Sequence, residues 1–179
     1  MVRTAASSRT IASSRTVASS RTIGSARTIV NDLLTSLISY WKLDEASGAL
    51  RRDSHGTNHL TDDSGLTGNA AGIISNAADF IASPDFDGLS IASNSTVQTG
   101  DIDFSVAGWF RFTSLADIQG VITKGNGGGN YEHTLYHGTA GSLLLSFSND
   151  GNTENILTCG TVLVDTWYHL VYWHDTTAN

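Results

Sequence analysis

The chain has 179 residues, with 10 Lys+Arg against 17 Asp+Glu, and its formal net charge is −7. Residues 1–30 contain five arginines and no acidic residue, so they carry +5 and the remaining 149 residues carry −12. Because this acidic part would repel phosphate, the charge balance argues against a nucleic-acid partner.

Other classes of protein are excluded by what the sequence lacks. No apolar run approaches ~18 residues, so we predict no membrane-spanning helix. The opening MVRTAASS has no apolar segment of the kind that a secretory signal needs. Cys159 is the single cysteine, which excludes an intrachain disulfide, and we expect this thiol to be buried or half-buried.

Residues 3–29 repeat with a period of six, as RTAASS, RTIASS, RTVASS, RTIGSA and RTI. Six is an even number, so an extended strand keeps each residue type on one face, whereas helical steps of ~100° would scatter the arginines. The repeat therefore predicts an extended arm, residues 1–30. The residues expected to make its contacts are Arg3, Arg9, Arg15, Arg21, Arg27, Ile11, Val17, Ile23 and Ile29.

Three interpretations of the arm stay open, because so few apolar residues cannot fold by themselves. The arm is ordered against other subunits, as strands added to a neighbour, or it is a disordered basic tail. The third interpretation is an organelle transit peptide, which its Arg- and Ser-rich, acid-poor composition fits. The regular register favours the first, since a repeated contact suits a symmetric assembly.

The rest of the chain predicts a short junction and an all-β domain. In the junction, residues 31–36, Asn31 or Asp32 is a candidate cap for one helical turn. Residues 37–179 alternate short strands with turns, which is typical of a β-sandwich or jelly roll. The predicted strands are Ile38–Leu43, Ala77–Phe80, Gly88–Ile91, Phe104–Phe112, Ile118–Lys124, Tyr131–His137, Ser142–Asn149, Asn155–Cys159 and Trp167–Asp175.

Local patterns add detail to these strands. Asp150-Gly151 predicts a hairpin turn, and the glycine-rich residues 125–129 predict a flexible hairpin loop. Both faces of Phe104–Phe112 and Trp167–Asp175 are partly apolar, which is typical of central strands. We therefore expect the tryptophans of these two strands to pack in the core; they are Trp109, Trp167 and Trp173.

Several segments resemble laminin-G-like, concanavalin-A-like jelly-roll domains. Residues 40–48 (YWKLDEASG) are similar to the opening strand of that family, and residues 53–60 (DSHGTNHL) to its Asp-Ser-x-Gly-x-Asn loop. Residues 76–91 resemble the next strands. Residues 103–110 (DFSVAGWF) and 166–171 (TWYHLV) resemble the Phe-Thr-Ile-x-x-Trp and Trp-x-His-Val strands.

The resemblance spans about residues 37–175 and implies a β-sandwich without naming a ligand. In the family, further strands follow the Trp-x-His strand, whereas this sequence ends at Asn179. We therefore expect either that the sequence is truncated or that another chain completes the sandwich, because an open central edge promotes aggregation.

Glycoside hydrolysis occurs in this fold, and the sequence argues against it here. Retaining glycosidases need two carboxylates about 5–5.5 Å apart, which the enzymes of this fold place in a Glu-x-Asp-x-x-Glu strand. The nearest match, residues 101–106 (DIDFSV), lacks the acid/base glutamate. His133 and His137 would lie ~13 Å apart on one strand, too far for a shared metal. We therefore predict no catalytic residues.

Calcium is the candidate cofactor, because laminin-G-like domains often bind it through loop aspartates and backbone carbonyls. Hard oxygen ligands occur in the pairs Asp62/Asp63, Asp85/Asp87 and Asp101/Asp103. The alternative is that these aspartates cap turns and keep the domain soluble. The metal ligands therefore stay undetermined.

Aromatic side chains next to the glycine-rich loop are candidates for a ligand-binding rim, because aromatic rings stack on sugars. These residues are Tyr131, Tyr136 and His137. Together, the features predict a non-enzymatic structural protein, such as a decoration, fibre or filament subunit of a virion or extracellular surface assembly, whose arm contacts other copies or other structural subunits. The alternative is a carbohydrate-binding module or adhesin with glycan partners.

Overall fold

The structure, a computed structural model, describes residues 34–46, 48–65, 67–81, 87–125, 131–148 and 154–177. The chain divides into two compact units, Met1–Leu37 and Ile38–Asn179. In the described part of the first unit, the Leu37 amide donates to the Leu34 carbonyl oxygen over 3.2 Å and closes a turn. The predicted arm and the capping candidates Asn31 and Asp32 lie outside the described residues.

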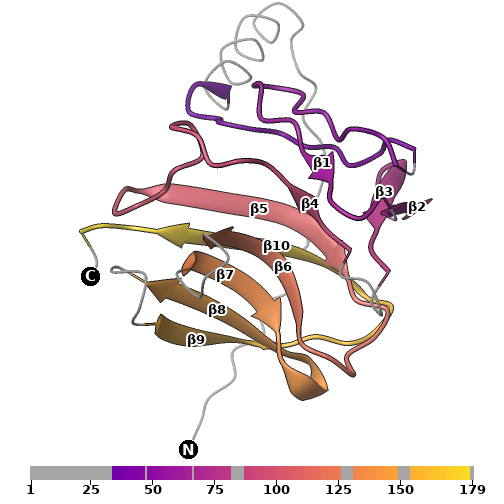
Figure 1. Ribbon diagram of the computed structural model, residues 1–179. Coiled ribbons are helices and arrows are strands. Elements are labelled where there is room, and N and C mark those ends of the chain that lie inside the picture. The colour runs from indigo at the N-terminus through magenta and orange to yellow at the C-terminus, as the bar shows by residue number, and fades with distance from the viewer. Residues whose placement is uncertain are drawn as a thin grey trace, which may run out of the picture. The chain divides into compact units, whose positions relative to one another are not determined.

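The described part of the second unit is all-β and its strands pair antiparallel, with one 3-10 turn, η1 (Thr139–Gly141) (Figure 1). The strands are β1 (Thr61–Asp62), β2 (Gly68–Ala71), β3 (Asn76–Asp79), β4 (Leu89–Ser90), β5 (Phe104–Arg111), β6 (Gln119–Gly125), β7 (Tyr131–His137), β8 (Ser142–Ser148), β9 (Glu154–Thr161) and β10 (Trp167–His174).

Two layers of strands enclose the core. One layer is a four-stranded sheet in the order β6-β7-β8-β9, and the other is the pair β10-β5, which lies over it in Figure 1. The buried core residues come from β7, β8, β10 and the segments after β5 and β9; they are Phe112, Leu135, Leu143, Leu145, Val162 and Tyr172. This packing is consistent with a β-sandwich.

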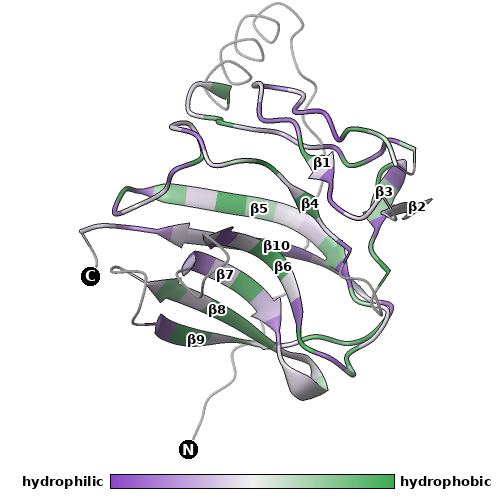
Figure 2. Cartoon of the chain, in the orientation of Figure 1, coloured by the Kyte–Doolittle hydropathy of each residue, from purple (hydrophilic) through white to green (hydrophobic). Residues whose placement is uncertain are grey.

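The alternation of the sequence explains which side chains reach this core. Exposure alternates along all eight residues of β5, and apolar and pale stripes alternate along it in Figure 2. Phe104 and Val106 face inward and pack on the core, as do Tyr168 and Leu170 of β10. Complete burial of an apolar side chain contributes roughly 1.5–3 kcal/mol, and these partly buried side chains contribute a fraction of that each. The two alternating strands thus cover one side of the core.

The predicted strands from residue 77 onward are confirmed to within a few residues, and Tyr131–His137 is found with those ends. The predicted strand Ile38–Leu43 is wrong, because only an isolated bridge joins Trp41 to Asp53 there. The Tyr40 amide donates to the Asp53 side chain rather than to a ladder, and Leu43 has φ +59°. That φ lies outside the extended region.

Two short strands, β1 and β2, were not predicted. Thr61–Asp62 reads as part of a turn, and Gly68–Ala71 has no β-branched or aromatic residue. The predicted hairpin turn and the glycine-rich loop lie between paired strands, β8–β9 and β6–β7. Residues 149–153 and 126–130 themselves lie outside the described residues.

Turn η1 leads into β8 and needs a glycine. Gly141 has φ +76°, and a Cβ atom there would lie 2.6 Å from the Val162 carbonyl oxygen. A larger residue would therefore be strained in both backbone and packing. Within the part of the chain that the structure describes, no helix has the length and apolarity to span a membrane.

Candidate functional site

A shallow pocket lies where several strands end. Glu132 enters it from β7, Phe104 from the start of β5 and His174 from the end of β10. The remaining lining residues are Thr99, Gly100, Asp101, Phe147 and Ser148. The pocket therefore combines aromatic walls with carboxylates, contributed by both layers and by the loop between β4 and β5.

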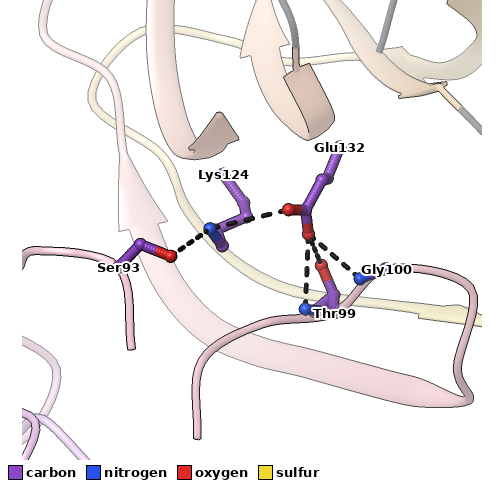
Figure 3. A network of polar contacts seen from close by, with 5 residues as sticks. All are labelled: Ser93, Thr99, Gly100, Lys124 and Glu132. Carbon is purple, nitrogen blue, oxygen red and sulfur yellow. Dashed lines mark hydrogen bonds and ion pairs between the residues drawn. The ribbon is translucent and has the colours of Figure 1, made fainter. Parts of the chain in front are cut away.

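Glu132 fixes the loop between β4 and β5 to the four-stranded sheet (Figure 3). Its Oε2 atom accepts the Thr99 hydroxyl at 2.5 Å, the Thr99 amide at 3.3 Å and the Gly100 amide at 3.1 Å. Its Oε1 atom lies 3.6 Å from Lys124 Nζ, which donates to the Ser93 hydroxyl over 3.2 Å. The network thus ties one loop to β6 and β7.

These bonds determine the charge of the carboxylate. Partial burial acts to raise the pKa of Glu132, but the hydrogen bonds from Thr99 and Gly100 and the charge of Lys124 outweigh it, so the pKa is lowered. Glu132 is therefore an ionised, fully engaged carboxylate. The other carboxylate that lines the pocket belongs to Asp101, which is exposed and lies on the loop between β4 and β5.

Aromatic rings line the pocket and continue into the core below it. The Phe104 ring stacks on His174 with 5.7 Å between centroids and lies 4.9 Å from His133. The Tyr172 hydroxyl is 3.1 Å from His133 Nδ1. Burial lowers the pKa of His133 to about 4 and raises that of Tyr172. The pocket can thus present aromatic surface, and the buried histidine behind it, His133, is neutral near pH 7.

The Asp-Ser-x-Gly-x-Asn segment forms a loop held by its own aspartate. Asp53 accepts the amides of Tyr40, His55, Gly56 and Asn58 at 2.9–3.1 Å. Burial acts to raise the pKa of Asp53, but the amide hydrogen bonds dominate and hold it well below its usual range. The loop therefore depends on a charged carboxylate as its centre.

Asn58 extends this loop to neighbouring segments. Its side-chain amide donates to the Ser39 hydroxyl, and its Oδ1 atom accepts from Asn94 and Thr96. The Trp41 indole donates to the Asn58 backbone carbonyl over 2.5 Å. The residues that carry the family resemblance here thus make tertiary contacts and leave little free for a ligand.

Arg51 is fully buried and contacts backbone carbonyls. Its two terminal nitrogens donate to the Ala46 oxygen and, at 3.2–3.3 Å, to four further carbonyl oxygens; these belong to Glu45, Ala49, Thr67 and Gly68. Its Nε atom is buried without a hydrogen-bond partner. The guanidinium therefore joins the segment before it to the start of β2.

Several of the aspartates considered for calcium accept hydrogen bonds within the protein. Asp62 accepts the amides of Gly65 and Thr67, at 2.8 and 3.1 Å. Asp87 accepts the hydroxyl of Thr67, and Asp103 accepts the amide and hydroxyl of Thr176. Asp85 lies outside the described residues. Among the described ones, no group of three or more His, Cys, Asp or Glu residues could hold a metal ion.

The predicted rim residues occupy different surroundings. His137 is fully buried: its ring lies 4.8 Å from that of Phe112, and its Nε2 is 3.2 Å from Gln119 Oε1. Tyr131 and Tyr136 are half-buried and come from opposite ends of β7. Exposed surface in this predicted rim thus belongs to the two tyrosines.

The outer face of the β5–β10 pair is open, which corrects the prediction that its tryptophans lie in the core. Trp109 and Trp173 expose 49% and 67% of their surface, and Val171 between them is also exposed. Trp167 is half-buried under the Arg111 guanidinium, 5.5 Å away. The register of the two strands places these residues on one face, and no described layer covers that face.

The prediction for Cys159 is also wrong, because this thiol is exposed. It lies on β9, where every residue is exposed although two large apolar side chains, Ile156 and Leu157, occur there. β9 is the last strand of its sheet and has β8 as its neighbour. We expected Cys159 to be buried because cysteines usually are, but its position on the last strand of the sheet leaves it exposed.

Neither the Glu132 network nor the contacts of Arg51 with backbone carbonyl oxygens was predicted from the sequence. Thr99 and Glu132 are 33 residues apart, and no local pattern signals their contact. No protein-family model, curated protein or solved structure matches this chain.

Proposed function

We propose that this chain is a non-enzymatic structural subunit of a virion or cell-surface assembly, and that its domain buries apolar surface against neighbouring subunits. The observation that carries the proposal is the open outer face of the β5–β10 pair. Trp109 and Trp173 project from it with Val171 between them. Contiguous exposed apolar patches on soluble proteins usually mark interaction sites.

The charges of this face agree with a contact between subunits. Its side chains are those of Ser105, Ala107, Trp109, Arg111, Trp167, His169, Val171 and Trp173. None is acidic, although residues 31–179 carry −12 overall. A neighbour can therefore cover this face without bringing carboxylates together.

We also propose that the domain is a laminin-G-like, concanavalin-A-like jelly roll. Support comes from the segments that resemble this family. Asp53 and Asn58 of the loop motif bond to residues on either side of them, from Ser39 to Thr96. The two other resembling segments form the paired strands β5 and β10.

The native mass of the intact chain tests the structural role. We expect light scattering to give a mass well above the 19.0 kDa of one chain. Val171→Lys should weaken self-association at least ~10-fold, because a charge would enter the buried patch. Ile74→Lys is the matched control, since Ile74 is 81% exposed in the turn between β2 and β3 and lies outside this face. A monomeric intact chain would refute the proposal.

A carbohydrate-binding module or adhesin is the second candidate. It is favoured by the same exposed rings. Trp109 packs on His169 at 5.0 Å, and Trp173 is 67% exposed on that face, so a sugar can stack on its ring. Selective binding on a glycan array by monomeric protein, lost in Trp173→Ala, would favour this function. An array without binding favours the structural one.

A further inference from the structure

Strand β9 is an open edge with apolar side chains. It ends the sheet order β6-β7-β8-β9, and β8 is its neighbour among the described residues. Ile156 and Leu157 expose 57% and 60% of their surface. Leu157 pairs with Leu145, which is almost fully buried in the core. The side chain of Leu157 therefore lies on the same face of the sheet, at its uncovered edge. Such an edge is a template for another strand.

The edge has limited protection against pairing. β9 contains one charged residue, Glu154 at its start, and no proline or lysine. A bulge at Cys159 interrupts the ladder to β8. The regular part is therefore Glu154–Thr158, on which Glu154, Ile156 and Thr158 share one face.

The hexad repeat has the complementary pattern. On one face of an extended hexad, arginine, a β-branched residue and serine follow one another at every second position. Laid parallel to β9, they place Arg15 beside Glu154, Val17 beside Ile156 and Ser19 beside Thr158. Each pair is favourable: opposite charges, two β-branched side chains and two hydroxyls.

The opposite orientation is less favourable. If the arm ran antiparallel with Val17 still beside Ile156, Arg15 would lie beside Thr158 and Glu154 beside a serine. The ion pair would be lost while the apolar pair stayed. The charge pattern therefore selects the parallel orientation, since hydrogen-bond geometry alone allows both.

The number of repeats indicates pairing between copies. The Arg-x-β-branched-x-Ser pattern recurs at Arg9, Arg15 and Arg21, so a shift of six residues restores the same contacts. One β9 edge accommodates about one hexad, which leaves the other hexads for other edges. The arm carries +5 against −12 for the rest of the chain, and 30 residues in a fully extended conformation would span roughly 100 Å.

We infer that the arm of one copy adds as a parallel strand to β9 of a neighbouring copy, with an arginine beside Glu154. This inference rests on the proposed structural role and names the surface that the arm binds. The binding mode is β-strand addition, in which backbone hydrogen bonds provide affinity and alternate side chains set the register.

Disulfide trapping in the full chain tests the register. In a Cys159→Ser, Thr158→Cys background, Ser19→Cys should form disulfide-linked dimers and larger species under mild oxidation, because the paired Cα atoms would be close enough for a disulfide. Thr16→Cys is the control, since no shift by six residues brings residue 16 beside residue 158. We expect at least ~5-fold more cross-linked product from Ser19→Cys.

Charge variants test the partner of the arginine. Adding Glu154→Gln to the Ser19→Cys chain should lower cross-linking at least ~3-fold, while Asp117→Asn, the same charge change at an exposed residue outside β9, should leave it unchanged. Equal yields from the two cysteine positions, a disulfide within one chain, or no effect of Glu154→Gln would overturn the inference.

The native mass of the unsubstituted chain separates the two proposals. An oligomer whose Ser19→Cys variant fails to cross-link refutes the pairing with β9 and leaves the structural role in place. A monomer of 19.0 kDa refutes the structural role itself. An oligomer that forms the Ser19→Cys cross-link, and forms less of it when Glu154→Gln is added, supports both the structural role and the pairing with β9.

Discussion

At the scale of single residues, His133 is a buried titratable group that lies among aromatic rings of the core. Its ring is 4% exposed and packs between Phe104 and Phe147. Desolvation lowers its pKa to about 4; Lys124 also lowers it, and Glu132 opposes this. The Tyr172 hydroxyl keeps its proton and can donate it to His133 Nδ1, so the fold favours the neutral imidazole.

We expect the free energy of unfolding to fall as the pH decreases from ~6.5 to ~4. In this window the unfolded chain protonates the histidine while the folded chain does not, so the unfolded state binds more protons. The full loss from His133 is about 3 kcal/mol, of which little occurs above pH ~6.5. Urea unfolding at several pH values measures it.

The matched variant is His133→Asn, whose side-chain oxygen can take the place of Nδ1 as acceptor for Tyr172. It should be less stable near pH 7, because part of the ring's packing is lost. Its stability should decline less between pH ~6.5 and ~4 than that of the unsubstituted chain. Equal slopes would show that other groups cause the acid sensitivity.

At the scale of elements, the position of a strand in the sheet decides what its leucines contribute. Leu135, on central β7, is 2% exposed, whereas Leu157, on edge strand β9, is 60% exposed. We expect Leu135→Ala to lower the free energy of unfolding by about 3 kcal/mol and Leu157→Ala by less than ~0.5 kcal/mol in monomeric protein. Denaturant unfolding of both variants measures this, and equal losses would contradict the edge assignment.

The strands that sequence predicts well are those with a strong period of two. Phe104–Phe112 and Trp167–Asp175 were predicted from their alternating faces, and both are strands to within one residue. Ile38–Leu43 fails, because the Asp53 carboxylate takes the Tyr40 amide that a ladder would need. An alternating pattern depends only on neighbouring residues. It cannot indicate that a side chain 13 residues away will accept a backbone hydrogen bond that the strand would need.

The same limit applies to the candidate surfaces. Alternation places Val171 and Trp173 on one face of their strand, but whether a face is covered depends on a second layer that no local pattern encodes. The Asp53 loop was visible as a motif because its residues are close in sequence. The Glu132 network was not visible in the sequence, because Thr99 lies 33 residues away from Glu132.

At the scale of the whole molecule, the separation of charge predicts that assembly depends on salt. In the proposed assembly, the +5 of residues 1–30 would attract the −12 of the remainder of a neighbouring copy. Raising the ionic strength from ~0.05 to ~0.5 M should weaken association several-fold, because screening shortens the range of charge attraction. Replacing the five arm arginines with glutamine should remove most of this dependence. Sedimentation velocity measures both, and an unchanged salt dependence would contradict it.

The buried guanidinium of Arg51 has a consequence for how this domain responds to its surroundings. Loops joined by a bound metal ion come apart when a chelator removes the ion. Arg51 is a cation attached to the chain itself and donates to carbonyl oxygens from both segments. The segment before it and the start of β2 therefore stay joined in solvents of widely different metal content.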